Sequence, residues 1–149
     1  MNDKAPAALP TLVAWLGYGG LIPFIVTALG ARLDDARGLF WSHALVCYGA
    51  SIVSFLGALH WGFAMTLPEI DSRRRHALFL WSVVLAIIAW IALLLPDRPT
   101  LMLLVVTLGA LVWRDRRLVA ALALPGWYLP LRLKLSVVAA ACLLAVAAS

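Results

Sequence analysis

Apolar residues in this chain come in long blocks, and polar residues gather in the short stretches between them. A helix that crosses a membrane needs about 20 apolar residues, and shorter ones are tolerated inside a bundle. Five such blocks occupy residues 9–29, 39–67, 76–95, 100–113 and 133–148. The pattern predicts an all-α integral membrane protein with one membrane domain over residues 1–149, folded as a five-helix transmembrane bundle.

The composition and the placement of charge support a membrane location. The chain is 64% hydrophobic and 13% charged, which is too apolar for a soluble domain of this size. Its net charge of +5 comes from short connections, so we expect the basic residues to set orientation and not to bind nucleic acid. Most of the twelve Lys and Arg residues fall on the side of the N-terminus. This bias predicts a multi-pass protein of the bacterial cytoplasmic (inner) membrane, with the N-terminus cytoplasmic and the C-terminus outside.

The connection between the fourth and fifth blocks is unusual, because it contains a short apolar run of its own. Residues 117–131 include LVAALAL, which is too short to cross a membrane, followed by Pro125 and Gly126. We predict an interfacial segment here, anchored by Trp127 and Tyr128. A re-entrant segment is the alternative. The six acidic side chains after the first block, Asp115 included, are expected in the connections between spans.

The second block contains YGASIVSFLGALHWG at residues 48–62, in which small residues recur at helical spacing. Small residues let two membrane helices approach closely, so we interpret this face as a packing seam that makes the helix central in the bundle. A small-walled cavity for a lipid or quinone tail is the alternative interpretation. The predicted seam comprises Cys47, Ala50, Ser51, Ser54, Gly57 and Ala58. The candidate pocket or packing motif comprises Ser54, Gly57, His60, Trp61 and Gly62.

A second local feature is WLGYGGLIPF in the first block, which combines glycines with a proline. Pro23 cannot donate a backbone hydrogen bond, and its ring collides with the carbonyl four residues back. We predict a kink at Gly19, Gly20 and Pro23. The simplest interpretation is a packing bend, and the alternative is a broken helix that offers backbone carbonyls to a ligand.

His60 is an ionisable residue inside a predicted span, and such residues are functional candidates by default. Burial favours a neutral imidazole with a hydrogen-bond partner, for which we consider Tyr18 or a carbonyl freed near Pro23. The chain offers no convincing pair of histidines for a haem. A packing histidine is therefore preferred, and a haem or quinone site centred on His60 is kept as the alternative.

Two arginine-rich stretches and one later arginine suggest contacts with anionic lipid headgroups. They flank predicted spans on the same side of the membrane, where they also act as topology signals. The candidate lipid contacts are Arg73, Arg74, Arg75, Arg114, Arg116, Arg117 and Arg132.

Three stretches of this chain resemble the sequence blocks of the domain-of-unknown-function 3429 family of small membrane proteins: LGYGGLIPF, YGASIVSFLGALHWG and PGWYLPLRLKLSV. The resemblance covers nearly the whole chain. It implies a membrane bundle, and it implies a basic hydrogen-bond donor at His60, because the family places histidine or arginine there. It implies no activity.

These observations together predict a non-enzymatic helical bundle that interacts with membrane lipids, with a membrane-protein partner or with a second copy of itself. We expect no catalytic residues, no metal site and no cofactor. A redox-linked protein that binds haem or quinone at His60 is the first alternative. A small transporter or channel is the second.

Overall fold

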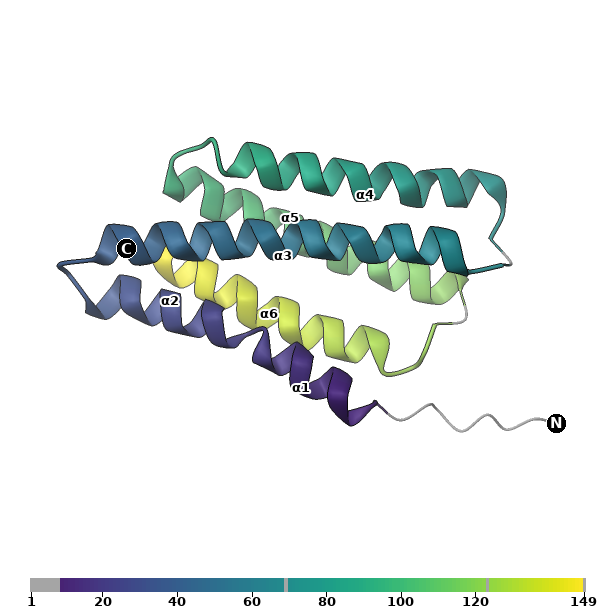
Figure 1. Ribbon diagram of the computed structural model, residues 1–149, viewed down its shortest axis with the longest axis horizontal. Coiled ribbons are helices and arrows are strands. Elements are labelled where there is room, and N and C mark those ends of the chain that lie inside the picture. The colour runs from purple at the N-terminus through teal and green to yellow at the C-terminus, as the bar shows by residue number, and fades with distance from the viewer. Residues whose placement is uncertain (1–8, 69, 123, 149) are drawn as a thin grey trace.

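The computed structural model describes residues 9–68, 70–122 and 124–148, and this part of the chain is helical throughout, with no strand. Figure 1 shows long helices that lie side by side, with the first helix beginning at one end of the bundle and the last helix ending at the other. The helices are α1 (Thr11–Gly19), α2 (Ile22–Leu33), α3 (Gly38–Thr66), α4 (Ser72–Ala92), α5 (Asp97–Ala121) and α6 (Tyr128–Ala147).

Four stretches are long and apolar enough to cross a membrane: Thr11–Leu33, which joins α1 and α2, and helices α3, α4 and α6. Helix α5 is not among them because charged residues near both of its ends shorten its apolar stretch. It nevertheless packs against α6, α3 and α4 as the fifth rod of the bundle. The all-α bundle is therefore confirmed, and the direction in which it crosses a membrane stays a prediction.

Helix α5 extends beyond the predicted fourth block. It continues past residue 113 to Ala121, and α6 begins at Tyr128. The part of α5 that lies in a membrane stays a prediction. The predicted interfacial segment 117–131 is thus divided between two helices and a short connection, of which residue 123 lies outside the described part. The physical reason is that the charged side chains of residues 114–117 can be accommodated on a helix. Asp115 is paired with Arg132 in the interior, and the guanidinium groups of Arg114 and Arg117 lie over aromatic rings.

Helix α3 occupies the centre of the bundle and contacts α2, α4, α5 and α6. Leucines from four helices fill the core around it and are completely buried: Leu45, Leu85, Leu104, Leu111 and Leu143. Helix α4 approaches α3 closely at Gly57, where an added Cβ would lie 3.0 Å from the Ser82 carbonyl oxygen of α4. The contact is narrower than the predicted seam, since Ser51 and Ala58 are exposed.

The stretch Thr11–Leu33, which forms the first rod of the bundle, is broken at the predicted kink. Helix α1 ends at Gly19, and α2 begins at Ile22 with Pro23 in its first turn, where a missing N–H costs no helical hydrogen bond. The break frees the carbonyl of Gly20, which accepts a hydrogen bond of 2.8 Å from the Tyr48 hydroxyl of α3. The freed carbonyl is therefore used to hold the first rod against the central helix.

Candidate functional site

Three ionisable side chains from three different helices meet inside the bundle. His60 of α3 is 1% exposed, Asp115 of α5 is 0% exposed and Arg132 of α6 is 7% exposed. Each lies within two helical turns of one end of its helix, at the end of the bundle where α1 begins (Figure 1). Buried charges are costly unless they are paired, so this cluster requires its own internal compensation.

Asp115 supplies that compensation, because its two carboxylate oxygens face the two basic groups. The Arg132 Nε donates a hydrogen bond of 3.0 Å to Oδ2 of Asp115. The His60 Nε2 lies 3.3 Å from Oδ1 of the same carboxylate, at ion-pair distance but without the alignment of a hydrogen bond. On its other side, the His60 Nδ1 donates a 3.0 Å hydrogen bond to the carbonyl of Leu56.

This arrangement fixes where one proton must be. A carbonyl oxygen can only accept, so the hydrogen bond to Leu56 places a proton on Nδ1 of His60. A neutral imidazole would then turn the lone pair of Nε2 toward a carboxylate oxygen, which is repulsive in an interior of low dielectric. Nε2 of His60 and Oδ1 of Asp115 therefore face each other without a hydrogen bond between them. Arg132 is permanently charged, and Asp115 is the carboxylate that compensates it.

Several donors around the cluster are not used. Nη2 of Arg132 and the hydroxyl of Ser136 are buried and have no hydrogen-bond partner among the described residues. The Tyr128 hydroxyl lies beside Arg132 and Asp115 without hydrogen-bond geometry. The ring of Phe63 contacts the rings of His60 and Tyr128 edge-on, at centroid distances of 6.2 and 5.7 Å. The cluster is thus shielded by aromatic rings but retains polar groups that could bind a ligand.

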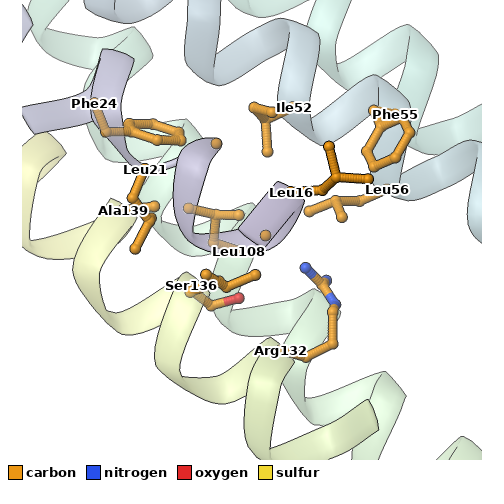
Figure 2. Close-up of a pocket in the computed structure, with 13 residues that line it drawn as sticks. Leu16, Leu21, Phe24, Ile52, Phe55, Leu56, Leu108, Arg132, Ser136 and Ala139 are labelled. Atoms are coloured by element: carbon orange, nitrogen blue, oxygen red, sulfur yellow. The ribbon is translucent and has the colours of Figure 1, made fainter. Parts of the chain in front are cut away.

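A cavity of about 130 Å³ lies next to Arg132, between α1, α3 and α6. Figure 2 shows the guanidinium group of Arg132 pointing into it, toward Leu16 and Leu56, with Ser136 on the same wall. The remaining lining is apolar. Leu16 and Phe55 line the cavity and are 67% and 60% exposed, so its mouth is at the outer surface of the bundle.

The structure corrects two predictions about this site. Asp115 was expected in a connection, but it lies in α5 and is buried. The predicted partners of His60 were also wrong, since Tyr18 is 43% exposed and the freed carbonyl of Gly20 accepts a hydrogen bond from Tyr48. His60 instead faces Asp115.

Sequence reasoning missed Asp115 because three arginines surround it. A signal was nevertheless present. Asp115 continues the helical spacing of the buried residues Leu104, Leu108, Leu111 and Leu118.

The other members of the predicted motif do not join the cluster. Gly57 packs against α4, and Ser54 is half-buried. Trp61 is 44% exposed, donates a hydrogen bond to the Met65 sulfur and contacts the Phe79 ring. An added Cβ at Gly62 would meet open space. Only His60 of this motif contributes a side chain to the polar cluster.

Three of the predicted lipid-binding arginines surround one groove between α4 and α5. The groove has a volume of about 330 Å³, an apolar floor that includes Leu78 and Leu118, and a rim that holds Arg74, Arg114 and Arg117. Arg73 and Arg116 are exposed outside its lining, and Arg75 donates to the Leu67 carbonyl. Arg132 lies apart from the other six, in the interior.

Aromatic rings and a backbone carbonyl hold the guanidinium groups of the groove. Arg114 lies over the Trp81 ring at 4.9 Å and donates to the Ala77 carbonyl, and Arg117 lies over Trp113 at 3.9 Å. Cation–π contacts of this kind leave most guanidinium N–H groups free to bind an acceptor. Arg74 is 3.5 Å from the exposed carboxylate of Asp71, which offsets part of the positive charge.

The arrangement of histidines does not favour a haem. Both ring nitrogens of His60 are occupied, one by a carbonyl and one by a carboxylate, so neither is free to bind iron. His43 is largely exposed, 3.6 Å from Asp97, and His76 is exposed as well. Within the described ranges, no three His, Cys, Asp or Glu side chains are grouped to hold a metal ion.

Comparison with known proteins places this chain among membrane proteins. The family model described as "Protein of unknown function (DUF3429)" matches residues 9–148. The chain is 37% identical over 140 residues to Transmembrane protein 69 of Xenopus tropicalis, an alignment that covers 91% of this chain and 53% of the relative. It is 26% identical over 131 residues to Transmembrane protein 69 of Mus musculus, covering 87% and 53%. The chain thus spans about half the length of these relatives, and no solved structure matches it.

Proposed function

The chain belongs to the DUF3429 family of multi-pass transmembrane proteins, and on this premise we propose that it is a non-enzymatic bundle that binds anionic phospholipid in the groove between α4 and α5. The observation that carries the proposal is the arginine rim. Three guanidinium groups converge on one apolar groove, and of the three only Arg74 has a carboxylate within 4.0 Å among the described residues.

The groove combines the two chemistries that a phospholipid presents at a membrane surface. Arg114 and Arg117 can donate several hydrogen bonds to a phosphate, and guanidinium groups match its geometry. Below them, the floor formed by Leu78 and Leu118 can receive the first part of an acyl chain. Trp113 also belongs to the lining, and tryptophan is enriched at the level of the lipid headgroups.

The position of the groove agrees with this ligand. The groove lies where α4 begins and α5 ends, at the end of the bundle where α1 begins (Figure 1). We place this end on the cytoplasmic side of a bacterial inner membrane, because basic residues concentrate there. Basic residues near a membrane surface are each attracted to anionic lipid by about 1 kcal/mol.

A charge-matched pair of double variants tests the proposal. The full chain is reconstituted in nanodiscs that contain a mixture of anionic and zwitterionic phospholipid, and retained lipids are counted by native mass spectrometry. Arg114→Gln/Arg117→Gln removes two charges from the groove, and Arg73→Gln/Arg116→Gln removes two exposed charges outside its lining. We expect the groove variant to lose its preference for anionic lipid by about tenfold or more, from two contacts of about 1 kcal/mol each. The control should keep most of that preference.

Two results would overturn the proposal. Equal losses in the two variants would mean that the arginines act through net charge and not through a site. An unchanged preference in the groove variant would place anionic lipid elsewhere on the bundle.

A further inference from the structure

We propose that the cavity beside Arg132 is a second ligand site, separate from the groove between α4 and α5, and that it takes the carboxylate of a long-chain fatty acid. The sites differ in position, size and exposure. The groove is at the surface between α4 and α5, whereas the cavity lies between α1, α3 and α6 and reaches the buried cluster.

The basic groups of the cluster point to an anionic ligand. One carboxylate, Asp115, faces two basic groups, and it accepts a hydrogen bond from Nε of Arg132 only, so that Nη2 of the same charged guanidinium has no acceptor among the described residues. The titratable or polar groups that face this charge are His60 from α3, Asp115 from α5, and Tyr128 and Ser136 from α6. The lining that α1 and α2 contribute to the cavity is apolar and adds no compensating charge.

The free donors point in the direction that such a ligand requires. Nη2 of Arg132 and the Ser136 hydroxyl lack partners among the described residues, and both residues are more than nine-tenths buried. Figure 2 shows the guanidinium group directed into the cavity rather than away from it. A buried donor without a partner costs free energy, and a ligand oxygen placed there recovers it.

The size of the cavity favours a ligand with a small head group and a single acyl chain. A cavity of about 150 Å³ holds one benzene molecule, so the 130 Å³ beside Arg132 suits a carboxylate with its first few methylene groups. The rest of the chain can leave through the mouth between Leu16 and Phe55, which face the lipid side of the bundle. A carboxylate fits this narrow end better than a phosphate ester with its glycerol.

The test uses the full chain in nanodiscs of zwitterionic lipid and radiolabelled hexadecanoate as the probe. We expect saturable binding of one hexadecanoate per chain. Hexadecanol, with the same chain and no charge, should compete at least about tenfold more weakly, because hydrogen bonds to an ionised acceptor are markedly stronger. Equal competition by hexadecanol would overturn the assignment of an anionic head, and tighter binding of hexadecyl phosphate would overturn the assignment of a carboxylate.

A pair of tryptophan variants on α1 locates the site without disturbing the cluster. Leu16→Trp adds bulk at the mouth of the cavity, and Leu12→Trp adds the same bulk one turn earlier, at a leucine that is equally exposed and does not line it. Hexadecanoate binding should fall at least about fivefold in Leu16→Trp only, through steric exclusion from the cavity. Equal binding by the two variants would overturn the proposal. This test leaves Arg132 unchanged, so it does not depend on whether Arg132→Gln folds.

The same assay separates this proposal from the proposed function. Arg114→Gln/Arg117→Gln should bind hexadecanoate as the parent does, because neither residue lines the cavity. Loss of hexadecanoate binding in that variant would show that the fatty acid occupies the groove, and it would refute the second site.

Discussion

The positive charges of two arginines in this protein are compensated by different groups. Arg114 and Arg132 lie on adjacent helices at the same end of the bundle, yet one reaches the surface and the other is buried. Arg114 lies over the ring of Trp81 and has no ion pair within 4.0 Å among the described residues, whereas Arg132 is bonded to Asp115. An aromatic ring is sufficient near the surface, where water and headgroups complete the solvation of a charge. In the interior a carboxylate is required.

Removing the buried carboxylate should give the largest loss of stability. Asp115→Asn leaves Arg132 in the interior without its counter-charge, and breaking a buried ion pair costs about 3–5 kcal/mol. We expect a loss of this size in the free energy of unfolding, measured by denaturant titration in detergent with circular dichroism. Asp97→Asn, at the less buried start of the same helix, is the control. A loss below that of the control would show that Asp115 does not compensate Arg132.

Changes at His60 should have an intermediate effect. His60→Leu leaves Oδ1 of Asp115 without its partner, and a buried acceptor without a partner costs about 1–3 kcal/mol. His60→Gln keeps a donor that can turn toward the carboxylate, so its free energy of unfolding should fall less. The same titration gives both values, with His43→Leu as an exposed control. Equal losses for Leu and Gln would mean that His60 contributes packing and not a polar contact with Asp115.

The smallest effect is expected at the groove. Arg117→Gln removes a cation–π contact at an exposed site, which is worth about 0.5–1 kcal/mol. Its free energy of unfolding should therefore change by less than that of either interior variant, while anionic lipid binding falls. If Arg117→Gln destabilised the bundle as much as Asp115→Asn, the distinction between the two arginine environments would be wrong.

The arrangement of apolar blocks was sufficient to predict the rods of this bundle, because each block must be buried in lipid or protein along its whole length. The break at Gly20 was likewise predictable, since the steric limits of proline are local. The cluster was not predictable in the same way. His60, Asp115 and Arg132 belong to three separate helices, and their meeting depends on how α3, α5 and α6 pack.

The end of α5 shows where a local rule failed. The sequence RDRR places four charges together at residues 114–117, and a run of charges ordinarily ends a membrane helix. Here the helical period sends Asp115 inward while its neighbours Arg114, Arg116 and Arg117 remain on the outer side. Judging each charge by its position around the helix would have placed Asp115 in the interior, although not beside its partners.

The break between α1 and α2 has a mechanical consequence. Helix α1 has nine residues, none of them buried, and it packs chiefly against α6, whereas α2 is anchored by Phe24 in the core. The two arms are joined at a fixed point, because Leu21 belongs to the core and the Gly20 carbonyl is bonded to Tyr48. Beyond that point, α1 contributes Leu16 and Gly17 to the wall of the cavity, and neither residue is buried. The width of the cavity therefore depends on the angle between α1 and α2, and this angle involves no other helix of the core.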